Sequence, residues 1–123
     1  MNTDRIDAMI KSAEDAYEAI RSLNHATIVA TIPAPVAYAL LGSLSQLEDA
    51  VSQLTRQIAA GLGRSLFDFD VYDDAREPVE SVRIAEAALV EVATHARRAA
   101  DRASAAQAAI AWQGFSLDKE DDR

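Results

Sequence analysis

A chain of 123 residues with a formal net charge of −8 has the size of one domain and repels nucleic acid and anionic lipid outside a local basic patch. The absence of cysteine excludes disulfides and thiolate metal sites. Half of the residues are apolar and only 6% are aromatic, which favours a mostly helical protein. Since no apolar run reaches the ~18 residues of a membrane span and the N-terminus is acidic, we expect neither membrane insertion nor a secretory signal, and a cytoplasmic location.

The first predicted helix covers residues 4–23. Thr3 is the expected N-cap, because its hydroxyl accepts an otherwise unpaired backbone N–H. An apolar stripe follows at helical spacing and stops at Asn24. Its members are Ile6, Ile10, Ala13, Tyr17 and Ile20. Residues 24–35 are expected to connect this helix to the next, since the strand-like segment 27–32 has no second strand to pair with.

The second predicted helix begins at Pro33 and Pro35, because proline suits the first turn of a helix. Gly61 and Gly63 weaken its C-terminal end, so we expect it to stop near residue 62. Between these limits an apolar stripe alternates three- and four-residue steps. It consists of Leu40, Leu44, Leu47, Val51, Leu54, Ile58 and Leu62.

The third predicted helix carries the most regular pattern of the chain. Nine positions recur at alternating three- and four-residue spacing: Val82, Ala85, Leu89, Val92, Ala96, Ala99, Ala103, Ala106 and Ile110. The change to alanine lets another helix approach closely. With Pro78 in its first turn and Gly114 after its end, the helix would run to Gln113, about 54 Å. It would then overhang the other two helices, and a second copy of the chain would cover the overhang.

Together these elements predict an all-α antiparallel three-helix bundle with a long alanine-rich third helix that self-associates. Residues 1–115 would form a single helical domain, and residues 116–123 a disordered charged tail. The preferred function is a non-enzymatic interaction or scaffold protein that acts through helix–helix contacts. Its partner would be a second copy, giving a homodimer, or another helical protein, but no membrane. The predicted interaction face is Ala96, Ala99, Ala103, Ala106 and Ile110.

No pattern indicates catalytic, cofactor-binding or metal-binding residues. A loop with four aspartates, Asp68, Asp70, Asp73 and Asp74, could offer oxygen atoms to calcium. Its turn glycine is missing, however, and Val79 stands where the bidentate glutamate belongs. We therefore prefer a solvated loop and leave cation binding open. His95 follows Glu91 by four residues, which favours a side-chain pair on one helix face over a metal ligand.

The alternative hypothesis is a nucleic-acid-associated regulatory protein of a mobile element. Its possible phosphate contacts are Arg97, Arg98 and Arg102, the densest basic patch of the chain. Asp101 interrupts this patch, and no helix-turn-helix or ribbon pattern accompanies it. A solvated helix face is thus the preferred interpretation, and nucleic acid is disfavoured as a partner.

Residues 32–36 (IPAPV), 72–74 (YDD) and 108–114 (AAIAWQG) together resemble uncharacterised small helical proteins of actinobacterial plasmids and other mobile elements. This resemblance implies a bacterial source and no particular activity. Trp112 and Gly114 also spell W-x-G, as in the small acidic helical hairpins exported by type VII secretion, which carry this motif in their central turn. Here it would lie at the end of the last helix, where Trp112 closing the bundle and Gly114 capping the helix explain it.

Overall fold

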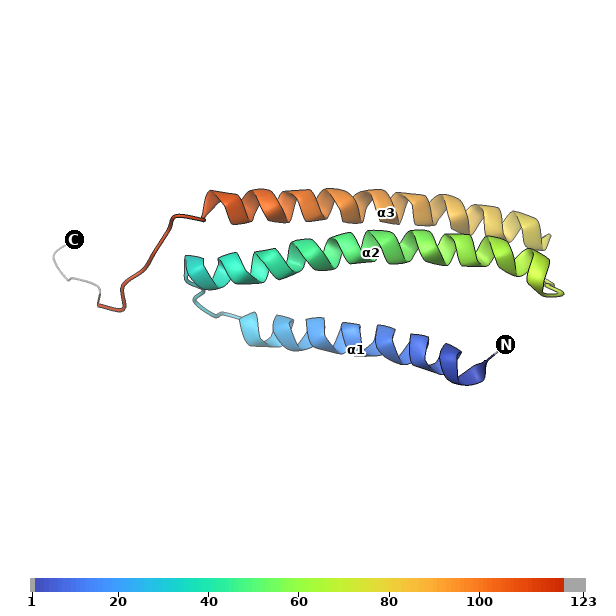
Figure 1. Cartoon of the computed structure of the whole chain (residues 1–123), viewed down its shortest axis with the longest axis horizontal. Coiled ribbons are helices and arrows are strands. Elements are labelled where there is room, and N and C mark those ends of the chain that lie inside the picture. Colours follow the sequence, from blue (N-terminus) through green and yellow to red (C-terminus); the bar gives the residue numbers. More distant parts are fainter. Residues whose placement is uncertain (1, 119–123) are drawn as a thin grey trace. The chain divides into compact units, whose positions relative to one another are not determined.

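The computed structural model describes residues 2–118 and contains three helices: α1 (Thr3–Thr27), α2 (Ala34–Asp68) and α3 (Pro78–Ala109) (Figure 1). No strand occurs in the described residues, which confirms the all-α class. The chain divides into two compact units, one that ends at Pro33 and holds α1 and one that begins at Ala34 and holds α2 and α3. None of the three helices combines the length and the apolar character needed to cross a membrane. Of the predicted tail, residues 119–123 lie outside the described residues.

The first unit consists of α1 and the connector that follows it. The N-cap is Asn2 and not Thr3, because the side chain of Asn2 accepts the N–H of Asp4 at 3.0 Å. The expected end at Asn24 is also wrong. The helix continues to Thr27, whose hydroxyl donates to the carbonyl of Leu23 at 2.8 Å. Asparagine has a low helix propensity, but the cost of one such residue inside a long helix is below about 1 kcal/mol.

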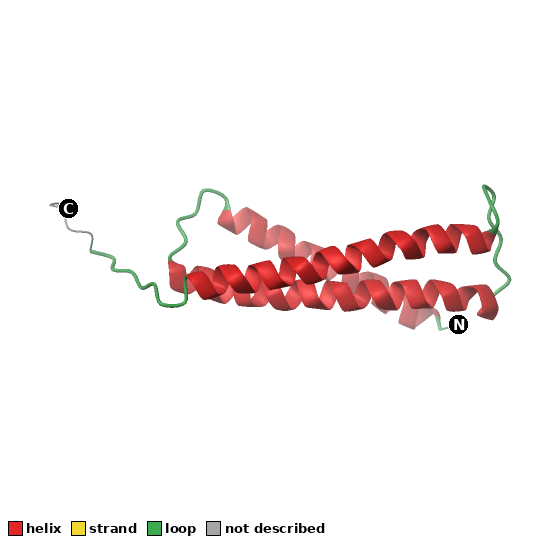
Figure 2. Cartoon of the chain, turned by 90° about the horizontal axis from the view of Figure 1, so that it is seen from above, coloured by secondary structure: helices red, strands yellow, loops and turns green. Residues whose placement is uncertain are grey.

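The second unit is an antiparallel hairpin of α2 and α3, which lie side by side along their lengths in both views (Figures 1 and 2). Both helices begin where proline predicted. Contrary to expectation, α2 passes Gly61 and Gly63 and spans 35 residues, whereas α3 stops at Ala109 after 32 residues. Each glycine costs a helix about 1 kcal/mol, which packing against a neighbouring helix outweighs. The predicted overhang of the third helix is therefore wrong, and with it this reason for a second copy.

Small side chains fill the contact between the two helices, which we call the seam. It consists of Ser45, Ser52 and Thr55 of α2 and Ala93, Ala96, Ala100 and Ala103 of α3. The hydroxyl of Ser52 donates to the carbonyl of Ala93 at 2.9 Å, and the hydroxyl of Ser45 donates to the carbonyl of Ala100 at 3.0 Å. These bonds run from side chains of one helix to the backbone of the other, so the two helices approach closely.

The position of the seam corrects the stripe predicted for the third helix. Ala96 and Ala103 are buried as expected, but Ala93 and Ala100 occupy the alternate positions predicted for Val92 and Ala99. The reason lies in α2. Its serine hydroxyls donate to the carbonyls of Ala93 and Ala100, so these residues, and not Val92 and Ala99, face α2. Thus α2 of the same chain covers the alanines that were expected to meet a partner.

Candidate interaction surface

The two long sides of the hairpin, to either side of the seam, differ in chemistry. On one side, Asp49 of α2 and Arg97 of α3 form an ion pair at 3.7 Å. Each lies four residues after a seam residue of its own helix, Ser45 and Ala93. Because the helices are antiparallel, equal rotations from the seam bring residues of α2 and α3 to the same side. We call this side the polar side; it includes Gln46, Asp49, Gln53, Arg56, Thr94, Arg97, Asp101 and Ser104.

The opposite side is reached by stepping back one residue from the seam, a rotation of about 100°. It contains Leu44, Leu47, Val51, Leu54 and Ile58 of α2 and Ala85, Val92, Ala99 and Ala106 of α3, and we call it the apolar side. Leu44 is 40% exposed, and Leu54, Ile58 and Val92 are between 46% and 52% exposed. None of these nine residues is charged or polar, but the same one-residue step from Ala96 and Ala103 also brings the exposed His95 and Arg102 to this side, so it is aliphatic on α2 and mixed on α3.

The helix α2 has fewer charged residues than a helix with one covered face usually has. Between Ala34 and Gly63 the helix carries three charged residues in thirty, Glu48, Asp49 and Arg56, whereas 26% of the whole chain is charged. A helix that is apolar on most of its circumference is typically covered on more than one face. The seam covers one face of α2, and the apolar side is a second, partly exposed aliphatic face of the same helix.

The aromatic side chains of the chain are exposed. All seven aromatic residues lie in the described part of the chain, and each is at least 43% exposed. Trp112 is 98% exposed, so the expectation that it closes the bundle is wrong. Gly114 does not cap α3 either, because the helix ends at Ala109 and the glycine has no positive φ. Aromatic residues in such exposed positions are typical of interfaces, where they supply much of the binding energy.

The structure buries some residues of the predicted interaction face and leaves others accessible. Ala96 and Ala103 are buried in the seam and unavailable to another chain, which corrects that part of the prediction. Ala99 and Ile110 are half-buried, and Ala106 is exposed. The apolar side thus keeps Ala99 and Ala106, and it adds the aliphatic residues of α2 that sequence reasoning had assigned to the interior.

The three arginines of the predicted basic patch also lie in different surroundings. Arg97 pairs with Asp49 on the polar side, whereas Arg98 and Arg102 are exposed without an ion pair among the described residues. His95 is exposed as well and forms no ion pair with Glu91, so their expected pairing is absent from this part of the chain. The three arginines do not converge on one point where a phosphate could bind.

The aspartates of the loop serve local structure. Asp68 is the last residue of α2, and Asp73 accepts the backbone N–H groups of Ala75 at 2.9 Å and Arg76 at 3.2 Å. The neighbouring Ser81 hydroxyl, followed by these two N–H groups, lowers the pKa of Asp73 below its ordinary value. Within residues 2–118 no three His, Asp or Glu side chains gather as metal ligands would.

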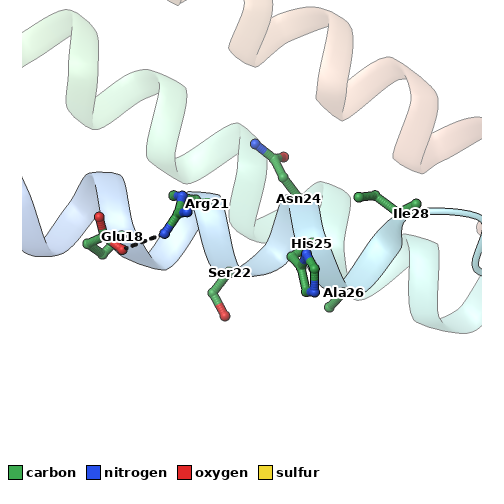
Figure 3. A pocket seen from close by; sticks show the side chains of 7 residues that line it. All are labelled: Glu18, Arg21, Ser22, Asn24, His25, Ala26 and Ile28. Atoms are coloured by element: carbon green, nitrogen blue, oxygen red, sulfur yellow. Dashed lines mark ion pairs between the residues drawn. The ribbon is translucent and has the colours of Figure 1, made fainter.

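A hollow of about 670 Å³ adjoins the C-terminal part of α1 (Figure 3). Its lining consists of Glu18, Arg21, Ser22, Asn24, His25, Ala26 and Ile28. Glu18 and Arg21 pair at 3.5 Å, while Ser22 and Asn24 point away from each other (Figure 3). A small-molecule site needs polar groups that converge inside a largely apolar cavity. These side chains leave one helix in different directions and do not form such a site.

No family model matches the chain, and neither a curated protein nor a solved structure shows significant similarity to it.

Proposed function

We propose that the chain is a non-enzymatic helical interaction or scaffold protein that acts through helix–helix contacts on the apolar side of its hairpin. One observation supports this most directly. The larger aliphatic side chains of α2, among them Leu54 and Ile58, lie outside the seam and remain about half exposed, whereas the seam contains small residues. A second helix laid on the apolar side would bury these side chains.

The free energy available from such a contact is substantial. Burying a whole Leu or Ile side chain contributes about 1.5–3 kcal/mol, so each half-exposed residue leaves roughly half of this unused. In the described residues, the apolar side chains that are buried belong to one valine, Val82, and four alanines. A hairpin with so little buried apolar surface gains stability from any further helix that covers its apolar side.

Cysteine accessibility tests whether the apolar side is open to other molecules. The chain has no cysteine, so Ile58→Cys introduces a single thiol on the apolar side and Gln53→Cys introduces a matched one on the polar side of the same helix. In the dilute, nanomolar protein both thiols should react with a maleimide at similar rates. A strongly protected Cys at position 58 at nanomolar concentration would mean that the chain covers this side itself, and would contradict the proposal.

A further inference from the structure

We infer that the molecule which occupies the apolar side is a second copy of this chain, with its α2 antiparallel to the first and a two-fold axis beside Val51. This inference rests on the proposed function and names its partner. Three properties of the hairpin support it: the spacing of the aliphatic residues on α2, the placement of charge and the size of the surface.

The aliphatic residues of α2 are arranged almost symmetrically about Val51. They lie 11, 7 and 4 residues before it and 3, 7 and 11 residues after it: Leu40, Leu44, Leu47, Leu54, Ile58 and Leu62. Val51 is also the central residue of α2, which runs from Ala34 to Asp68. A two-fold axis at this point places Leu44 level with Ile58 of the second copy. The same patch is then used by both chains, as an isologous two-fold interface requires.

The charges of the hairpin favour the antiparallel arrangement over a parallel one. The end where the loop joins the helices carries a net charge of −5 over residues 68–80, from one arginine, Arg76, and six acidic residues, Asp68, Asp70, Asp73, Asp74, Glu77 and Glu80. Parallel chains would bring two such ends together, whereas antiparallel chains separate them by the length of α2, about 50 Å, which exceeds the Debye length of ~8 Å several times. Glu48, at the border of the apolar side, would lie level with Leu54 of the second copy and not with its own counterpart.

The size of the apolar side matches the need of a stable dimer. Two adjacent helices make it about 20 Å wide, and the aliphatic stretch from residue 40 to 62 is about 35 Å long. The resulting footprint of about 700 Å² is close to the ~800 Å² per partner of a standard interface. The polar side has similar dimensions, but a partner there would have to desolvate the pair of Asp49 and Arg97 and their charged neighbours.

Disulfide trapping in the full-length chain tests both the partner and its orientation. Val51→Cys places two thiols beside the two-fold axis, so mild oxidation should convert most of the protein to a covalent dimer. Leu44→Cys alone should not crosslink, because its two copies would be separated by 14 residues, about 21 Å. Mixing it with Ile58→Cys should give a crosslinked pair. Gln53→Cys, on the polar side, is the matched control and should stay uncrosslinked.

Light scattering over a hundredfold concentration range accompanies the trapping. We expect the untrapped protein to approach twice 13.3 kDa. Self-crosslinking of Leu44→Cys as efficient as that of Val51→Cys would overturn the antiparallel arrangement. A monomer at every concentration, without trapping of Val51→Cys, would overturn the dimer. If Ile58→Cys is then freely reactive, the proposed function stands with a different helical partner; if it is protected, the function fails as well.

Discussion

The polar and apolar sides of the hairpin share the same two helices and the same seam, yet they differ in what they leave exposed. The polar side closes with direct bonds: Asp49 pairs with Arg97, and the hydroxyl groups of Ser45 and Ser104 lie 2.8 Å apart. On the apolar side, Ile58 and Val92 face no partner within the hairpin and stay about half exposed. The contrast shows that direct hydrogen bonds and an ion pair join the two helices on the polar side, while aliphatic side chains on the apolar side remain partly exposed.

The close approach of the helices explains this division. At Gly42, an added Cβ atom would lie 2.7 Å from Nε2 of Gln107, which itself donates to the carbonyl of Tyr38 at 2.9 Å. A side chain of the size of leucine at position 42 could not be accommodated without displacing Gln107 or moving the helices apart. Leu44, Leu54 and Ile58 of α2 lie beside the seam, whereas Leu41, four residues before Ser45, lies on the seam face and is half-buried.

The largest difference in stability is expected between substitutions of two adjacent alanines of α3. Ala100 is 1% exposed in the seam, so Ala100→Leu should overpack it and lower the free energy of unfolding by about 1–3 kcal/mol. Ala99 lies one residue back, on the apolar side, and Ala99→Leu should cost less than about 0.5 kcal/mol at a protein concentration low enough to dissociate the proposed dimer. Urea unfolding of the two variants measures the difference. Equal costs, or a larger cost at Ala99, would contradict the position of the seam.

This pair also shows how much of the fold could be predicted from the sequence. Apolar periodicity and proline placement predicted three helices and two of their starts, because both act locally. Periodicity could not distinguish Ala99 from Ala100, since α3 has alanine at both positions. The choice depends on hydroxyl groups from α2 that bond to carbonyls 41 and 55 residues away in the chain. Such bonds leave no trace in the pattern of a single helix.

The candidate surface was predicted in part, for a related reason. The periodicity of the stripe from Leu40 to Leu62 predicts a buried face, because large aliphatic residues at helical spacing are usually buried. The signal that could have corrected this lies in Ser45 and Ser52, which repeat at seven residues on the other face of α2 and match the alanines of α3 in size. Small residues on both helices indicate the closer of two possible contacts.

A smaller effect should follow from removing one hydrogen bond of the seam. Ser52 is 2% exposed and donates to the carbonyl of Ala93, so Ser52→Ala should destabilise the protein by about 0.5–1.5 kcal/mol. Ser43 is exposed on the same helix, and Ser43→Ala should be neutral or slightly stabilising because alanine is the better helix former. Thermal unfolding of both variants gives the comparison. A Ser52→Ala variant as stable as Ser43→Ala would show that packing alone aligns the helices.

The smallest effect is expected on the polar side. The carboxylate of Asp49 and the guanidinium of Arg97 are 3.7 Å apart, with side chains 52% and 62% exposed, so solvent and salt screen their attraction. A double-mutant cycle with Asp49→Ala and Arg97→Ala should give a coupling free energy below about 0.5 kcal/mol at low salt. At about 1 M salt the coupling should vanish. A coupling that exceeds 1 kcal/mol and persists in salt would mean that the pair is shielded from water, as it would be if a partner covered the polar side, and the contrast between the two sides would then be lost.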